Sequence, residues 1–285
     1  MSDISGHTYR DLLIPHFLEV LKIMDEVLTS YQVPYYLIGV NATNLQFLKE
    51  GIKPFRGTKD IDFAVMLSSF AEYEKIKDAL TYKGFHKLTS PFTLIHGDYS
   101  VVIDLLPFGQ IEENDTVSFT EREVIMNVLG FKETLEEAKE ISVDHTFSIL
   151  VPPLHGMVVL KLISWSDRPE VRANDLEDIY RIVSHYCDIE SKSLYSEHAD
   201  LLDTDTFDNK RIAARLMGRR IAFVLEKSNK VKARILNVLS VNATDPMTSE
   251  IGKYWAGRYD ISVEYAITIL ELLRLGIQDN LAKNK

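Results

Sequence analysis

In the first half of the chain, apolar positions switch between helical and strand spacing. Residues 10–30 place apolar side chains three or four positions apart, which predicts a helix despite the early Pro15. A run of strand length, YYLI, then leads through Gly39 into a second helical segment. We expect Asn41 or Thr43 to cap that helix. The pattern therefore predicts helix, strand, tight turn and helix.

The stretch KDIDFAVM, residues 59–66, predicts a second strand. A helix follows it, which Ser68 or Ser69 can cap and which Gly84 ends. Residues 97–98, Gly and Asp, are suited to a hairpin turn between later strands. Further strand-like pieces lie at 85–88, 92–96, 100–108, 134–142 and 146–151, of which 134–142 also fits a helix.

From Leu154 onward the apolar period becomes 3.6, which predicts a run of helices. The helical windows are HGMVVLKLISW, NDLEDIYRIVSHY, RIAARLMGRRIAFVLEK and VEYAITILELLRLG. The acidic, serine-containing stretch at 188–208 is the expected internal linker. The predicted fold class is α+β. A small mixed-sheet domain with an N-terminal helix would occupy residues 1–152, and an α-helical domain would occupy residues 153–285.

Composition narrows the class of protein. The 285 residues are 46% apolar and 26% charged, as in soluble globular proteins. The chain has no uncharged apolar window of about 18 residues and no secretory leader pattern, so we expect no membrane span and a cytoplasmic location. The single Cys187 agrees with a reducing compartment and is expected to pack in a helix. A net charge of −10 argues against general coating of nucleic acid or anionic membrane.

Two carboxylates begin the second predicted strand. Because residues i and i+2 of a strand share a face, Asp60 and Asp62 project to one side, about 7 Å apart, while Ile61 points to the core. Such a pair is unfavourable unless a cation lies between the charges, and Mg²⁺ prefers carboxylate oxygens. Asp104 lies in a later apolar strand, VVIDLLPF. If the two strands are neighbours, the three carboxylates form a site for two Mg²⁺ ions; otherwise they are solvated strand acids.

The carboxylates belong to a longer motif. A glycine turn precedes a strand with the string R-x-T-x-D-I-D, and an acidic strand, a lysine helix and a D-x-x-D helix follow. The arrangement resembles the nucleotidyltransferase superfamily of DNA polymerase beta and, more narrowly, the AbiEii-type abortive-infection nucleotidyltransferase toxins. The matching residues, between 35 and 180, are Gly39, Arg56, Thr58, Asp60, Asp62, Asp104, Lys161, Asp175 and Asp178.

The resemblance implies a metal-dependent enzyme that moves a nucleoside monophosphate from an NTP to an acceptor hydroxyl, with two Mg²⁺ ions as cofactors. The implied acceptor is a tRNA 3′ end or a protein hydroxyl, and a toxin of this kind would have an antitoxin partner. The implied catalytic residues are Asp60, Asp62, Asp104 and Lys161, and the first three would bind the metal. The implied nucleotide-binding residues are Gly39, Asn41, Arg56, Thr58, Arg168, Asp175 and Asp178.

Other interpretations stand beside these roles. Lys161 and Arg168 are seven residues apart on a predicted helix, and both could reach a triphosphate. Lys161 could equally pack its aliphatic stem at an apolar domain boundary and keep its charged end in water. Asp175 and Asp178 could instead have a purely structural role, in which they cap their helix and pair with nearby arginines. Val40 stands where the family has a second glycine or a serine. It motivates an alternative function, a catalytically inactive nucleotide-sensing or interaction module.

A basic segment lies at residues 210–234 of this acidic chain. Arg211, Arg215 and Arg219 recur at helical spacing and could guide an RNA backbone, or form a solvated face that balances nearby acids such as Asp208. A further alternative is a small-molecule, antibiotic-like acceptor, because an acidic cleft would attract a cationic alcohol. The sequence leaves the acceptor, the NTP and the oligomeric state open.

Overall fold

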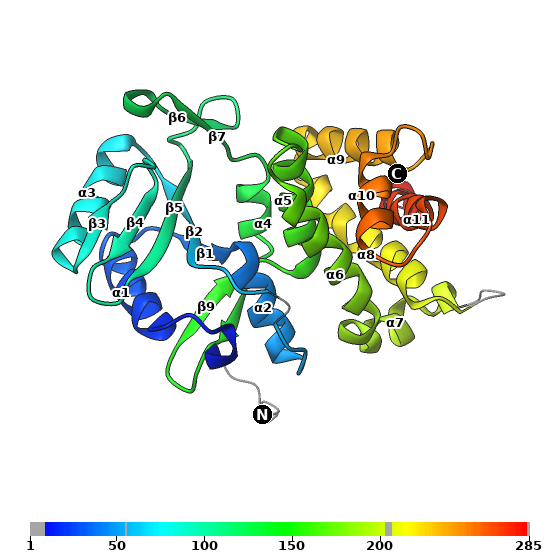
Figure 1. The fold of residues 1–285 in the computed structure, drawn as a ribbon, viewed down its shortest axis with the longest axis horizontal. Coiled ribbons are helices and arrows are strands. Elements are labelled where there is room, and N and C mark those ends of the chain that lie inside the picture. Colours follow the sequence, from blue (N-terminus) through cyan, green and yellow to red (C-terminus); the bar gives the residue numbers. More distant parts are fainter. Residues whose placement is uncertain (1–8, 55, 203–206, 284–285) are drawn as a thin grey trace. The chain divides into compact units, whose positions relative to one another are not determined.

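The computed structural model describes residues 9–54, 56–202 and 207–283 (Figure 1). The chain divides into two compact units, one ending at Pro153 and one beginning at Leu154. The first unit contains a mixed β-sheet and the second is built of helices, so the predicted α+β class is confirmed. Among the described residues, no helix has both the length and the apolar character needed to cross a bilayer.

A five-stranded sheet organises the first unit. Its strands are β1 (Tyr35–Ile38), β2 (Asp60–Leu67), β3 (Phe85–Lys87), β4 (Thr93–His96) and β5 (Val101–Gly109), in the spatial order β1-β2-β5-β4-β3. β2 and β5 run parallel, and all other neighbours are antiparallel. The expected strands at these positions are confirmed. The order also makes β2 and β5, the two strands with aspartates, direct neighbours.

The aspartates of β2 and β5 lie on one face of this sheet and the first apolar residues of these strands on the other. One face carries the fully buried side chains of Ile61, Phe63, Ile103 and Leu105. Helices α1 (Phe17–Ser30) and α3 (Phe70–Tyr82) cover this face (Figure 1). Tyr35 of β1 donates a hydrogen bond of 2.6 Å to Asp25 of α1. Because side chains alternate along a strand, the aspartates of β2 and β5 lie on the opposite face.

The first helix begins later than its apolar spacing predicts. α1 starts at Phe17, because Pro15 interrupts the helix and His16 adopts a positive φ of 53°. The preceding residues form a separate 3-10 helix, Tyr9–Leu12. The expectation of one helix over 10–30 is therefore wrong in its first part.

The second helix begins directly at the glycine turn. α2 (Gly39–Lys49) has Ile38 as its N-cap residue, so the expected caps Asn41 and Thr43 are wrong. Ser69 does cap α3, and its hydroxyl accepts a hydrogen bond from the backbone N–H of Glu72. The chain thus passes from β1 into α2 without a loop.

Smaller elements complete the first unit. They are the helix α4 (Phe131–Leu135) and two hairpins, β6 (Thr116–Phe119) with β7 (Val124–Asn127) and β8 (Lys139–Ser142) with β9 (Ser148–Val151). The ambiguous stretch at 134–142 therefore contains the end of a helix and then a strand. The β6–β7 hairpin was not predicted.

The second unit consists of helices. They are α5 (Leu154–Asp167), α6 (Ala173–Ile189), α7 (Ser191–Glu197), α8 (Asn209–Glu226), α9 (Asn229–Asn242), α10 (Glu250–Arg258) and α11 (Val263–Lys283), with a 3-10 helix at Ala199–Leu202. The predicted helical windows fall on α5, α6, α8 and α11. The expected linker at 188–208 is wrong over its described part, because buried Leu194 and Leu201 fold it into α7 and the 3-10 helix. α9 and α10 were not predicted.

α8 and α11 cross at two glycines. A Cβ atom on Gly218 would lie 2.1 Å from the main-chain oxygen of Leu273, and one on Gly276 would lie 2.1 Å from that of Arg215. Side chains of any size would separate the two backbones. This crossing therefore requires glycine on both helices.

Candidate active site

Parallel pairing of β2 and β5 brings three aspartates together. Asp62 lies directly opposite Asp104, and Asp60 lies two residues before Asp62 on the same face. One carboxylate oxygen from each aspartate lies within 4.8 Å of the other two, and all three side chains are half-buried. The cluster is therefore fixed by strand register, and its ligand atoms are on rigid elements.

Three carboxylates at this separation repel one another. At 4.8 Å each ionised pair costs about 1 to 4 kcal/mol, depending on how far water screens it. A hard divalent cation removes this cost, because Mg²⁺ and Ca²⁺ take carboxylate oxygens as ligands. Zinc sites instead draw on thiolates and imidazoles. The all-carboxylate donor set therefore fits a divalent metal of the Mg²⁺ type.

Asp60 is held by a threonine of the motif and by an asparagine of α2. The Thr58 hydroxyl donates a hydrogen bond to Oδ1 of Asp60, and Nδ2 of Asn41 donates one of 2.8 Å to the main-chain oxygen of Asp60. Asn44, one turn further along α2, donates a bond of 3.0 Å to the main-chain oxygen of Arg56. Both asparagines are 1% exposed. The segment with Arg56 and Thr58 is thus tied to α2 just before β2 begins.

Gly39 joins β1 to α2 and packs against Asp62. Its φ is +70°, and a Cβ atom there would lie 2.0 Å from Oδ2 of Asp62. Both the conformation and the close approach require glycine. Val40 is buried in the first turn of α2 and does not share the positive φ. The valine is therefore compatible with the backbone of this turn.

Asp104 has a hydrogen-bond partner that the sequence did not single out. Thr93 lies opposite Asp104 in the antiparallel pair of β4 and β5, and its hydroxyl donates a bond of 2.6 Å to Oδ1 of Asp104. Thr58 makes the corresponding bond to Asp60. Two threonines thus orient the first and the last carboxylate of the cluster.

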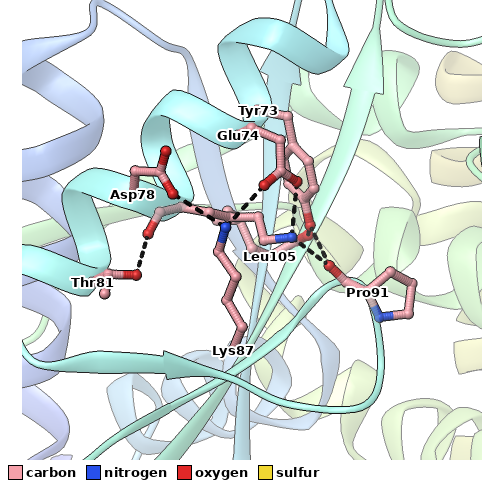
Figure 2. Close-up of polar contacts among 8 residues, drawn as sticks. Tyr73, Glu74, Asp78, Thr81, Lys87, Pro91 and Leu105 are labelled. Atoms are coloured by element: carbon pink, nitrogen blue, oxygen red, sulfur yellow. Dashed lines mark hydrogen bonds and ion pairs between the residues drawn. The ribbon is translucent and has the colours of Figure 1, made fainter. Parts of the chain in front are cut away.

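Tyr73 of α3 supports the strand at Asp104 (Figure 2). Its hydroxyl donates a hydrogen bond of 3.0 Å to the main-chain oxygen of Leu105, the residue after Asp104. Burial raises the pKa of Tyr73 well above its ordinary value, and the nearby charges of Glu74 and Asp104 raise it further. Tyr73 therefore stays protonated and remains a hydrogen-bond donor at neutral pH.

Lys77 of α3 supports the segment before Thr93. Its Nζ donates hydrogen bonds of 3.0 Å to the main-chain oxygen of Pro91 and to Oε1 of Glu74, and it lies 4.9 Å from the centre of the Tyr73 ring. Lys77 is 7% exposed. A buried, paired cation thus fixes the connection that leads into β4, so α3 contacts the main chain next to each partner of the Thr93–Asp104 bond.

In the second unit, Lys161 forms a buried cluster with two aspartates. Its Nζ lies 3.1 Å from Oδ1 of Asp175 and 2.5 Å from Oδ2 of Asp178. The three residues are 5%, 9% and 0% exposed. Arg168 is exposed one residue beyond the end of α5, so it does not continue the helix face of Lys161. The structure brings the lysine and the D-x-x-D pair together and leaves Arg168 apart.

The arginine stripe of α8 is balanced by acids. Arg215 and Arg219 both donate hydrogen bonds to Asp279, at 3.0 and 2.9 Å, and Arg219 also pairs with Asp200. The side chain of Arg219 is 6% exposed. Arg211 lies 3.6 Å from the Asp208 carboxylate. These pairs favour the balanced helix face over a stripe that guides RNA.

Cys187 is a packing residue. Burial raises the pKa of its thiol to about 11, with Asp188 and Asp208 adding to the shift. Its Sγ lies 3.1 Å from the main-chain oxygen of Asn209. The thiol is therefore protonated at neutral pH and is a poor nucleophile.

No protein-family model and no curated protein matches the chain. Solved structures do show similarity. The solution structure of the antibiotic-resistance factor ANT(2″)-Ia is 14% identical, with 65% of this chain and 94% of that chain covered and a TM-score of 0.38. An antigenic nucleotidyltransferase-like protein from Paracoccidioides brasiliensis is 13% identical, with 81% and 94% covered and a TM-score of 0.37. A CCA-adding enzyme in complex with CTP is 14% identical, with 87% and 60% covered and a TM-score of 0.33. Similarity at this level assigns the chain to no family.

Proposed function

We propose that the protein is a divalent-metal-dependent nucleotidyltransferase that moves a nucleoside monophosphate from an NTP to an acceptor hydroxyl. The observation that carries this proposal is the convergence of Asp60, Asp62 and Asp104 within 4.8 Å on one sheet face. The R-x-T-x-D-I-D motif adds support, because its threonine orients the first of these carboxylates. Strand register brings the three side chains together, the string contains Asp60 and Asp62, and threonine hydroxyls orient Asp60 and Asp104.

The phosphates of the NTP would bind at the N-terminal end of α2. This 11-residue helix starts at Gly39, which lies against Asp62, and its N-cap residue Ile38 supplies no side-chain cap. The first-turn N–H groups of a helix and its dipole both favour an anion at such a position. Bound at the three carboxylates, two Mg²⁺ ions would neutralise the phosphates and acidify the acceptor hydroxyl. The glycine turn would thereby hold the donor phosphates beside the acid cluster.

The reaction is an in-line displacement at the α-phosphorus. The acceptor oxygen forms a bond to the α-phosphorus while the bond to the pyrophosphate oxygen breaks. Asp104 assists by taking up the proton of the acceptor hydroxyl, in an orientation that Thr93 fixes. Asp60 and Asp62 would hold the metal that binds the triphosphate of the NTP. Positioning and charge neutralisation therefore supply most of the rate enhancement.

Narrower assignments rest on the resemblance of the motif. They are the roles of Lys161, Arg168, Asp175 and Asp178 toward the triphosphate, the choice of Mg²⁺, a toxin activity with an antitoxin partner, and an acceptor on tRNA or protein. Lys161 and the two aspartates would act as one unit, because they are paired in a buried cluster. The cytoplasmic location rests on composition.

Incubation of the pure protein with Mg²⁺ and each α-labelled NTP, with and without total tRNA, tests the proposal. Wild type should transfer label and release pyrophosphate, and Asp62→Asn should do neither while keeping its fold. Transfer by Asp62→Asn at the wild-type rate would refute the assignment. If wild type transfers nothing to RNA, to itself or to a panel of small alcohols, the non-catalytic module becomes the better function.

A further inference from the structure

A pocket lies at the N-terminal ends of β2 and β5. Its volume is about 210 Å³, and its lining comes from residues 13–15, 58–59 and 100–102. These segments are the loop before α1 and the starts of the two parallel strands. The pocket therefore belongs entirely to the first unit, which also holds the three aspartates.

The pocket adjoins the acid cluster through two of its lining residues. The hydroxyl of Thr58 lines the pocket and donates its hydrogen bond to Asp60. Val102 also lines it, lies opposite Asp60 in the strand register, and precedes Asp104 by two residues on the same face. A group bound in the pocket would thus lie beside Asp60 and Asp104.

Leu13 at the pocket wall directly follows the 3-10 helix Tyr9–Leu12, and its N–H donates a hydrogen bond of 3.1 Å to the main-chain oxygen of Arg10. Its φ is +58°, in the region that favours glycine, and its side chain is 85% exposed. Ser100 on the opposite wall also has a positive φ, of 55°. Both residues lie at chain reversals, Leu13 after the 3-10 helix and Ser100 in the turn between β4 and β5, so local hydrogen bonds hold the two walls in these conformations. An exposed leucine held at such an angle is suited to cover an apolar ligand.

Ring stacking holds the two walls together. His16, which follows the loop at 13–15, stacks on Tyr99 with ring centres 4.3 Å apart and planes 15° apart. Tyr99 precedes Ser100 and stacks in turn on the buried His96, with ring centres 4.1 Å apart. The pocket is therefore preorganised, and binding need not order its walls.

The position of the pocket relative to the glycine turn indicates which of the two reactants, donor or acceptor, the pocket would bind. The turn at Gly39 lies against Asp62 and on the β1 side of β2, whereas the pocket lies at Asp60 and on the β5 side. In an in-line displacement the attacking and leaving oxygens are on opposite sides of the phosphorus. Since the donor phosphates would lie at the turn, the attacking group would approach from the pocket side.

We propose that this pocket binds the ring system that carries the accepting hydroxyl, a neutral group of nucleoside size, and so places that hydroxyl next to Asp104. The proposal rests on the proposed function. The walls at 13–15 and 101–102 are apolar and suit the face of a base, while Thr58, Lys59 and Ser100 supply polar groups for a sugar. The charge of Lys59 disfavours a cationic alcohol and favours the phosphodiester of a nucleic acid end. Such a ring comes either from a free nucleoside or from the 3′ end of RNA.

Substitutions on the pocket walls test the proposal without touching the aspartates. Ile14→Trp and Val102→Phe fill the pocket from opposite walls. Leu13→Asn removes the apolar cover and relieves the strain, because asparagine tolerates a positive φ. Ile125→Trp, at a side chain that is 72% exposed on β7, is the matched control. The acceptors are the four free nucleosides and a short RNA with or without its 3′ hydroxyl.

The filled variants should raise KM for the acceptor about tenfold or more and leave KM for the NTP within about twofold. Leu13→Asn should raise KM for the acceptor while its melting temperature stays equal or increases, which a purely structural role would not produce. Acceptance of free nucleosides would identify a small-molecule source, and acceptance of RNA alone would identify the 3′ end. Unchanged acceptor KM in both filled variants would overturn the proposal.

A second measurement separates this proposal from the proposed function. Nucleoside binding to the full chain, followed by NMR titration without NTP, should be present in wild type and Asp62→Asn and lost in Ile14→Trp and Val102→Phe. That result with no transfer by wild type would support the pocket and refute the transferase function. Two results would refute the proposed role of the pocket. One is that wild type neither binds a nucleoside nor transfers label, and the other is that the filled variants still bind the nucleoside.

Discussion

Gly39 and Asp62 are in contact across the junction of β1 and β2, and a Cβ atom on Gly39 would lie 2.0 Å from Oδ2 of Asp62. The contact couples the start of α2, where donor phosphates would bind, to the central carboxylate of the acid cluster. Any side chain at position 39 must displace one of the two. The backbone of the turn therefore determines the geometry of the metal ligands.

Gly39→Ala should reduce nucleotidyl transfer about 100-fold, because even a shift of about 1 Å in a positioned group has an effect of that size. Gly57→Ala is the matched control, since a Cβ atom there meets nothing within 4 Å. It should keep transfer close to wild type. Equal activity of the two variants would show that the contact with Asp62 has no catalytic importance.

Thr93→Val should weaken divalent-metal binding about tenfold, as loss of a group that orients a metal ligand commonly does. The hydroxyl of Thr93 fixes Oδ1 of Asp104 at 2.6 Å, and valine keeps the shape without the donor. Thr93→Ser restores the hydroxyl and should restore affinity. Calorimetric titration with Mn²⁺ measures both. If serine fails where valine fails, packing and not the hydrogen bond is responsible.

Gly218→Ala should lower the free energy of unfolding by about 2 to 3 kcal/mol, because it forces apart the backbones of α8 and α11. Its Cβ atom would lie 2.1 Å from the Leu273 oxygen. Gly257→Ala in α10 has open space, so it should stabilise by about 0.5 kcal/mol through helix propensity. Urea denaturation measures the difference, and equal effects would contradict the close crossing.

Asp279 should make the protein less stable in acid. Burial alone would raise the pKa of Asp279, but hydrogen bonds and charge from Arg215 and Arg219 outweigh it, so the folded-state pKa is lowered. The stabilisation is therefore present above the unfolded-state pKa of about 4 and is lost as pH falls through the lower folded-state value.

Asp279→Asn should lower the free energy of unfolding by about 1 to 2 kcal/mol at pH 7 and flatten its decline below about pH 4. The exposed Asp260→Asn is the control, and denaturation at a series of pH values is the measurement. A decline as steep in Asp279→Asn as in wild type would show that this aspartate does not cause the acid sensitivity.

The sequence predicted the strands of the sheet and the aspartates on them, because strand alternation and apolar runs are local properties. It did not predict Thr93 as the partner of Asp104. That pairing depends on the connection between β4 and β5, where residues 97–100 form the turn and not the expected two residues 97–98. A two-residue loop would have placed Thr93 opposite Val102.

Other misses have the same physical origin in tertiary contacts. The expected cap by Asn41 is wrong because its side chain instead donates to the backbone of Asp60, a residue distant in sequence. The spacing of the arginines on α8 indicated side chains that could bind RNA phosphates, but Arg219 is buried between Asp200 and Asp279. Neither pairing leaves a signal in the local spacing of residues.

One binding measurement decides whether Asp60, Asp62 and Asp104 form a metal centre. Electron paramagnetic resonance counts the Mn²⁺ ions bound per chain in the presence of a non-transferable NTP analogue. We expect about two ions in wild type and at most one in Asp62→Asn and Asp104→Asn, each checked for native fold. A wild-type protein without bound Mn²⁺, or aspartate variants that bind as many ions as wild type, would contradict a metal-dependent transferase built on these three carboxylates.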